Sequence, residues 1–319
     1  MLKTERWLQR QQARMLACSH FHVIFTISHL LDPLWRTNTR FMTDILFQSA
    51  RDTLFRELGP AGGRYHLGTP GFIAALHTWG RNLHLHPHLH CLVTGGGLSA
   101  TGEWAACRNG YLLPYRKVRS VFRNRFLELL WRRLERGELA LPKEWTEQKA
   151  KTVVLKAWKK KWNVHLREQY AHGNGVLKYL SRYVTGGPIS NRRIVAFENG
   201  RVTYRYKDHE DGKTKTLKLP TNRFIWRILQ HVPEPGTQVV RHYGIYARQK
   251  QQDLEVCRAQ LNQPPVQEPK ALRWEDYLEE RSGIDPRVCP VCGAHLLSTK
   301  LKPEPRARTT PSESLDHAA

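Results

Sequence analysis

The amino-acid sequence predicts an α+β fold in which an antiparallel central sheet carries packed helices. Strand and helix signals follow one another in the order strand, helix, strand, strand, which is half of a split βαβ palm. A row of alternating histidines, His84 to His90, opens the last of these strands. Farther along the chain, three short strand signals joined by tight turns predict a small β-meander, and a helix follows it.

The first half of the palm has clear element boundaries. In order, the patterns predict a short helix over 3–17, a strand over 21–26, a helix over 38–58, a strand over 72–78 and a strand over 84–93. Asn38 is placed to cap the long helix, and Gly59 followed by Pro60 ends it. The glycines Gly95–Gly97 are expected to turn the chain after the histidine strand.

The second half of the palm combines basic helices with one more strand. The patterns predict an arginine-rich helix over 118–136, a lysine-rich segment around Trp158 over 149–161, a strand over 162–166 and a loop over 167–174. Most of these charges are expected to form a solvated helix face, although basic residues beside tryptophan can also grip phosphates and stack bases. A further helix is predicted over 176–185, with Asn174 as its N-cap and Gly186-Gly187-Pro188 as its stop.

The rest of the chain divides into smaller parts. Meander strands are predicted over 194–197, 202–206 and 214–219, with a hairpin turn at Asn199-Gly200, a helix over 222–232 and a closing segment over 241–246. The predicted parts of the chain are a helical N-terminal remnant (1–19), the palm (20–190), the meander and helix extension (191–250), a linker (251–285), a candidate zinc knuckle (286–297) and a disordered tail (298–319).

The charge of the chain points to a polyanionic partner. Its 319 residues include 51 lysines and arginines against 28 aspartates and glutamates, which gives a net charge of +23. A field of that sign attracts nucleic acid. No apolar run approaches the roughly 18 residues of a membrane-spanning helix, and no signal peptide precedes Met1. We therefore expect a cytoplasmic protein with no membrane partner.

The histidine row predicts a metal site. In an extended strand, side chains alternate between faces, so His84, His86, His88 and His90 are all expected on one face. Neutral imidazoles backed by leucines find a partner most simply in a divalent cation. The alternative is a solvent-facing histidine run without a role.

Two tyrosines on the helix predicted over 176–185 are candidate nucleophiles. Tyr179 and Tyr183 are four residues apart, so their phenols lie on one helix face. The alternative is a pair of core tyrosines. Next to a metal and a basic surface, however, a phenol can attack a phosphodiester that the cation polarises. A second phenol one turn away can accept another strand, which strand transfer requires and hydrolysis does not.

Several motifs together resemble a known family. His88-Leu89-His90 resembles the metal-binding motif of HUH endonucleases, and Tyr179-Leu180-Ser181-Arg182-Tyr183 resembles the two-tyrosine motif of that superfamily's rolling-circle transposases, the insertion-sequence family numbered ninety-one. The surrounding segments that share the resemblance are 21–26, 76–80, 86–91, 189–191, 241–244 and 289–293. The resemblance spans about residues 15–297 in unbroken order.

This resemblance implies an RRM-like HUH palm that cleaves and rejoins single-stranded DNA at transposon ends and target, with Mg²⁺ or Mn²⁺. On the matching positions, His88 and His90 are expected to ligate the metal, and Tyr179 and Tyr183 to be the nucleophiles. His77, on the neighbouring strand, is the preferred third ligand, and His86 is the alternative. Lys178 and Arg182 flank the tyrosines and are expected either to contact DNA phosphate or to be solvated helix charges.

One departure concerns zinc. Family members carry a cysteine- and histidine-rich region ahead of the palm that this sequence lacks, which bears on recognition of the element's ends. Cys289 and Cys292 form half a zinc knuckle, which His295 or Cys257 would have to help complete, and two free thiols are the alternative. Two other functions stay open: a replication initiator or relaxase on the same palm, and a truncated DNA-binding remnant without catalysis.

Overall fold

The computed structural model describes residues 2–59, 65–108, 110–170, 177, 187–208, 211–297 and 299. It divides into two compact units, Lys3–Lys270 and the residues from Ala271 onward. The second unit contains α9 (Trp274–Ser282) and a bridge between Val288 and His295. None of the described helices is both long and apolar enough to cross a membrane.

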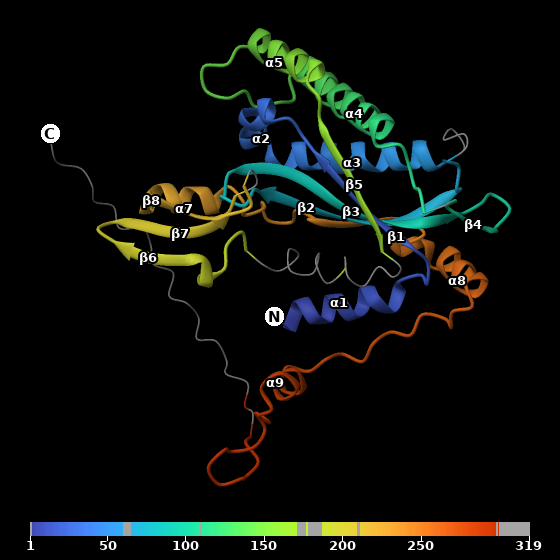
Figure 1. Ribbon diagram of the computed structural model, residues 1–319, viewed down its shortest axis with the longest axis vertical. Helices are drawn as coiled ribbons and strands as arrows, with labels where there is room; N and C mark the ends of the chain where they lie inside the picture. Colours follow the sequence, from blue (N-terminus) through green and yellow to red (C-terminus); the bar gives the residue numbers. More distant parts are fainter. Residues whose placement is uncertain are drawn as a thin grey trace. The chain divides into compact units, whose positions relative to one another are not determined.

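The first unit is built on an antiparallel sheet with the strand order β5-β1-β3-β2-β9 (Figure 1). Its strands are β1 (His20–Thr26), β2 (Thr69–Trp79), β3 (Leu85–Leu98), β5 (Asn163–Tyr170) and β9 (Val240–Gly244), and the short β4 (Trp104–Ala106) pairs with β3. Both β1 and β2 pair antiparallel with β3, which lies between them. The chain between β1 and β2 contains α2 (Asp32–Thr37) and α3 (Thr39–Leu58). This is the predicted split βαβ arrangement, and it confirms the α+β fold class.

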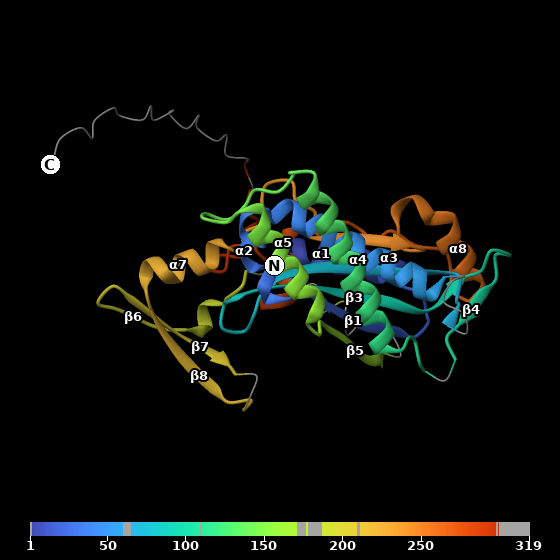
Figure 2. The ribbon, with the colours of Figure 1, turned by 90° about the horizontal axis from the view of Figure 1, so that it is seen from above.

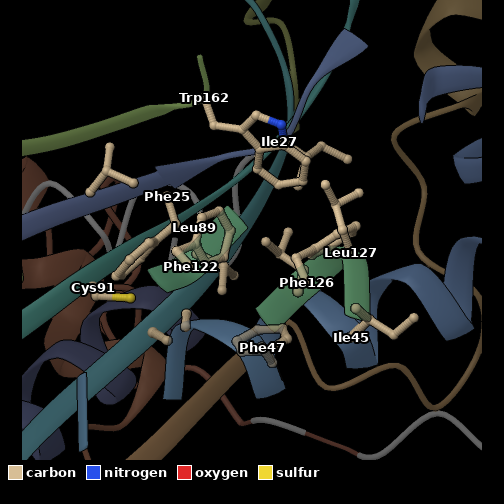
Figure 3. Close-up of a cluster of buried hydrophobic side chains, with 14 of the residues drawn as sticks. Phe25, Ile27, Ile45, Phe47, Leu89, Cys91, Phe122, Phe126, Leu127 and Trp162 are labelled. Atoms are coloured by element: carbon tan, nitrogen blue, oxygen red, sulfur yellow. The ribbon is translucent and has the colours of Figure 1, made fainter. Parts of the chain in front are cut away.

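One face of the sheet is apolar and is covered by α3, α4 (Tyr115–Glu135) and α5 (Glu147–Lys159) (Figures 1 and 2). The apolar side chains of α4 repeat every fourth residue, which gives the helix one continuous buried stripe: Val118, Phe122, Phe126, Leu130 and Leu134. Phe122 packs against Phe25 of β1 and against Trp162, with ring centroids 4.8 and 5.6 Å away (Figure 3). This cluster is the main core of the unit.

The opposite face carries the histidines of the same strands. Because side chains alternate along a strand, His22 points away from its neighbours Phe21 and Val23, which lie in the main core. The apolar residues on this second face form a separate cluster with α1 (Leu2–Arg14) and α8 (Gln251–Gln260): Leu8, Met15, Leu16, Ile73, Ala75, Leu92, Leu177, Ile245, Tyr246, Leu254 and Cys257. The sheet therefore separates the apolar layer under α3, α4 and α5 from a layer that contains both apolar side chains and histidines.

The predicted turn at Gly95–Gly97 is wrong, because β3 continues through these glycines to Leu98. Gly96 pairs with Ala106 of β4. A Cβ atom at Gly96 would lie 2.3 Å from the Trp104 ring, so glycine is required for β4 to pack this closely. The glycines thus permit a close approach of two strands and do not reverse the chain.

Two other boundaries differ from the prediction. Strand β5 extends to Tyr170, into the range predicted as a loop. Asn38 is the N-cap residue of α3, but its side chain makes no capping hydrogen bond. Its amide donates to the carbonyl oxygen of Ala140 instead, and its carbonyl accepts from the Ala140 amide, each at 2.8 Å. Asn38 therefore ties the start of α3 to a distant loop.

The meander forms a second sheet of β6 (Ile194–Glu198), β7 (Arg201–Lys207) and β8 (Thr214–Pro220), followed by α7 (Thr221–Leu229). Asn199 and Gly200 have φ values of 50° and 68°, the backbone that a tight two-residue hairpin requires, so this prediction is confirmed. The range predicted as a linker, 251–285, contains α8 and α9. Of the predicted tail, 298–319, only residue 299 is described.

Candidate metal centre

Three histidines from two neighbouring strands converge on one face of the sheet. His77 of β2 is the cross-strand partner of His88 of β3, and His90 follows two residues later. The ring centroids are 4.2 Å apart for His77–His90, 4.9 Å for His88–His90 and 5.3 Å for His77–His88. One ring nitrogen from each lies within 4.8 Å of the others. We call this group the histidine triad.

Hydrogen bonds orient two of these rings. The Nδ1 atom of His88 lies 2.6 Å from the carbonyl oxygen of His86. A carbonyl oxygen only accepts, so Nδ1–H is the donor and Nε2 of His88 keeps its lone pair. His90 Nδ1 is 2.7 Å from His22 Nε2 of β1. This contact orients the His90 ring through its Nδ1 atom, as the His86 carbonyl orients the His88 ring. Both contacts are of the kind that fixes a ligand histidine from behind.

Burial keeps two rings of the triad, His77 and His88, uncharged at neutral pH. Loss of hydration lowers the pKa of His88 to about 4; the hydrogen bond to the His86 carbonyl opposes this shift, and the nearby His22 adds to it. Burial also lowers the pKa of His77 well below its usual value, and the nearby His88 and His22 add to this shift. A neutral imidazole is the form that binds a metal ion, so no proton has to be displaced at pH 7.

The third member of the group is His77 and not His86. His86 Nδ1 lies 3.2 Å from Nε2 of His29, whose other ring nitrogen contacts Asp32 at 3.1 Å. His84 is exposed and precedes β3, because the chain turns at Leu83, where φ is 63°. The predicted row of four imidazoles on one strand face is therefore wrong at His84. The group forms across two strands.

The predicted nucleophiles Tyr179 and Tyr183, and their neighbours Lys178 and Arg182, lie outside the described residues. Leu177, two positions before Tyr179, is described. It is helical and fully buried in the second apolar cluster, together with Ile73 and Leu92. Ile73 and His77 are four residues apart on β2, and His90 and Leu92 are two apart on β3, so each pair points to the same face of the sheet. Because Leu177 packs with Ile73 and Leu92, it lies on the triad's side of the sheet.

Among the described residues, the histidine triad is the one group of three or more metal-ligating side chains close enough to share an ion, and neither Cys289 nor Cys292 belongs to it. Cys257 is buried in the second apolar cluster. Backbone N–H groups of Cys292 and Val291 lower the pKa of the Cys289 thiol. A zinc knuckle in this segment stays a prediction.

Sequence reasoning did not identify two histidines that support this face. His22 holds His90, and His20 Nε2 lies 2.7 Å from the hydroxyl of the buried Tyr246. A signal was present, because His20 and His22 alternate with Phe21 and Val23 and so had to leave the apolar face. The pairing of His20 with Tyr246 joins residues 226 apart and needed the fold.

A basic chain whose sheet presents three clustered histidines on one face has the features of an enzyme that acts on nucleic acid. Comparison with known proteins narrows this broad class of nucleic-acid enzymes to one family. Residues 71–253 match the transposase family Y2_Tnp, described as "Putative transposase". The chain belongs to this family, which confirms the resemblance drawn from its motifs and makes DNA its substrate.

Two relatives are similar along most of their length. The chain is 36% identical over 302 residues to "Putative transposase y4qJ" of Sinorhizobium fredii (strain NBRC 101917 / NGR234), covering 91% of this chain and 75% of the relative. It is 30% identical over 306 residues to "Transposase for insertion sequence element IS801" of Pseudomonas savastanoi pv. phaseolicola, covering 93% and 71%. No solved structure matches the chain significantly.

Proposed function

We propose that this transposase cleaves and rejoins single-stranded DNA by the HUH route, with a divalent metal on the histidine triad and Tyr179 and Tyr183 as nucleophiles, for rolling-circle transposition. The observation that carries the proposal is the convergence of His77, His88 and His90 on one face of the palm. Family membership supplies the reaction class.

The donor set of the triad fits a metal ion that accepts nitrogen ligands. Three neutral imidazoles suit Mn²⁺ better than Mg²⁺, which prefers oxygen. An ion held by His77, His88 and His90 would leave positions open for phosphate oxygens and would polarise the phosphorus. His22 and the His86 carbonyl would keep the ligating nitrogens of His90 and His88 aimed at it.

Leu177, the described residue of this segment, lies on the same side of the sheet as the histidine triad. In the proposed step, a tyrosine oxygen forms a bond to phosphorus and the bond from phosphorus to the 3′ oxygen breaks. The phenol gives up its proton and the leaving strand gains one as a free 3′-hydroxyl. The 5′-phosphate stays on the enzyme as a phosphotyrosine, and the reverse reaction with another 3′-hydroxyl joins the strands.

The test is a covalent adduct. The protein is incubated with Mn²⁺ and 3′-end-labelled single-stranded DNA carrying the ends of its own element, and products are separated on a denaturing protein gel. Wild type is expected to retain label. Single Tyr179→Phe and Tyr183→Phe variants are expected to lose part or all of it, and the double variant all of it. Tyr277→Phe, in α9, is the matched control and is expected to behave as wild type. Adduct formation by the double variant would overturn the assignment of the nucleophiles.

A further inference from the structure

A pocket of about 290 Å³ lies at the edge of β2, beyond the end of β9. Its walls come from the start of α3, the end of β2, the segment 230–239 and Gly187-Pro188. Its mouth is open, since Gly187 and Val232 are exposed. We call it the Thr43 pocket. The described residues that line it include threonines, valines, prolines, one glutamine, one histidine and one tryptophan, but no lysine, arginine, aspartate or glutamate.

Two hydroxyl groups of this pocket lack a hydrogen-bond partner within the described part of the chain. They are Oγ1 of Thr43 and Oγ1 of Thr237, and Thr43 is only 1% exposed. A buried polar atom left without a partner costs roughly 1–3 kcal/mol, so folded proteins rarely keep one without a reason. Both residues line the same cavity, and a polar ligand in that cavity would supply the missing partners.

The other polar groups of the pocket have a defined pattern. His231 Nε2 is 3.2 Å from the carbonyl oxygen of Leu83, so it is the donor, and Nδ1 accepts from the Thr78 hydroxyl at 3.2 Å. Burial lowers the pKa of His231, so the ring is neutral at pH 7. The Thr78 oxygen can still accept a hydrogen bond. The described lining thus offers neutral hydrogen-bonding groups, namely threonine hydroxyls and the Gln230 amide.

This lining selects a neutral, flat ligand with several hydrogen-bonding atoms. A phosphate or carboxylate would lose its hydration here without gaining a cation from the described lining residues. A nucleobase is uncharged and fits a cavity of this size. It would also bring donors and acceptors for the unpartnered hydroxyls and a face for stacking. Nucleobases are available because the substrate is DNA, although a base enters such a pocket only when it is unstacked.

One tryptophan connects the pocket to the metal centre. Trp79 lines the pocket, and its ring stacks on His77 of the triad with centroids 5.5 Å apart and planes 14° apart. The pocket lies at the edge of the sheet: Thr43 and Leu76 belong to its apolar side, whereas Trp79 also contacts the histidine triad. A strand bound at the triad would pass over this edge for one of its bases to reach the pocket.

We propose that the Thr43 pocket binds one unstacked nucleobase of a single DNA strand beside the metal centre and selects it by hydrogen bonds to Thr43 and Thr237. The inference rests on the proposed function, because it takes single-stranded DNA as the substrate. It adds a base-selecting site that is separate from the catalytic residues.

The experiment measures base preference without chemistry. Fluorescently labelled dA12, dC12 and dT12 are titrated with the full chain in EDTA at a fixed salt concentration high enough to weaken phosphate contacts, and affinity is read from anisotropy. Wild type is expected to bind one of the three at least about tenfold more tightly than the weakest. In the Thr43→Val/Thr237→Val double variant, this preference is expected to fall to about twofold or less.

Two controls separate recognition from folding. The double variant removes hydroxyls that have no partner, so its melting temperature is expected to equal or exceed that of wild type. Thr53→Val, on the same helix, removes a hydroxyl that donates to the Ser49 carbonyl oxygen at 2.7 Å and does not line the pocket. It is expected to keep the wild-type base preference.

The outcomes are distinguishable. If wild type binds the three strands equally, or if the double variant keeps the preference, the pocket proposal is overturned, and the adduct assay still decides the proposed function. If a preference depends on Thr43 and Thr237 but no adduct forms, the pocket proposal stands and the cleavage chemistry fails.

Discussion

The two faces of the sheet use the same strands for different purposes. In β1 and β3, Phe25 and Leu89 point into the apolar core under α4, while His22 and His90 point to the opposite side. The apolar face is filled by side chains with no hydrogen-bonding requirement. The histidine face mixes apolar side chains with polar rings that need hydrogen-bond partners from other strands. The main apolar core thus lies on one side of the sheet, and the candidate metal centre lies on the other.

This difference makes the two faces respond differently to substitution. An apolar contact depends on volume, and any neighbour of the right shape supplies it. A histidine centre depends on which ring atoms face one another, so a change in one ring is expected to affect the proposed metal binding more than the stability of the fold. Each prediction below tests whether stability and activity separate in this way.

The largest expected effect is the loss of cleavage when the triad is removed. His88→Ala and His90→Ala are each expected to lower the cleavage rate with Mn²⁺ by on the order of a thousandfold, because the phosphate loses its electrostatic partner. Salt-sensitive DNA binding is expected to remain, since it comes from lysine and arginine contacts. His84→Ala, at an exposed position outside the triad, is the control. Equal loss of binding and cleavage would contradict a metal role.

On the apolar face, Phe122→Ala is expected to lower the free energy of unfolding by about 3–5 kcal/mol, because it leaves a cavity among fully buried rings. Urea denaturation followed by tryptophan fluorescence measures this change. Phe197→Ala, at a position that is 67% exposed, is expected to change it by less than about 0.5 kcal/mol. Similar losses for the two variants would mean that α4 does not cover the core described here.

A third prediction concerns pH and a histidine away from the triad. Burial lowers the pKa of His242 to about 4, and its Nε2 is 2.7 Å from Gln11 Oε1. Between pH 6.5 and 4 the unfolded chain binds a proton that the folded chain does not, so stability falls as pH falls through this range. His242→Gln is expected to reduce that loss by about 2 kcal/mol at pH 4.5. Parallel denaturation curves at pH 7.5 and 4.5 measure it, and an unchanged pH dependence would contradict the assignment.

The smallest expected effect is at the ring that supports the triad. His22→Leu removes the partner of His90 Nδ1 and is expected to weaken Mn²⁺ binding, measured by calorimetry, by about 10–100-fold. His20→Leu is the matched control, because His20 contacts the Tyr246 hydroxyl and lies two residues away on the same strand. It is expected to lower stability and to leave the affinity for Mn²⁺ nearly unchanged. Equal Mn²⁺ affinities of wild type and His22→Leu would show that His22 does not support the metal centre.

Much of this architecture was predictable from local patterns. Alternation placed His88 and His90 on one face, and the four-residue repeat of α4 gave its buried stripe. Local patterns failed at Gly95–Gly97, where glycine served close packing against Trp104 and not a turn. They also failed at Asn38, whose side chain bonds a residue about a hundred positions away. In both cases the partner was not a sequence neighbour.

The sequence by itself determined the fold class, the basic character of the chain and the two histidines of β3, because period, charge and spacing are properties of one segment at a time. Only the tertiary structure decided that His77 and not His86 joins His88 and His90, that His22 holds His90, and that the hydroxyls of Thr43 and Thr237 share one cavity. Those facts depend on strand register and on helix packing, which bring together side chains that no single segment contains.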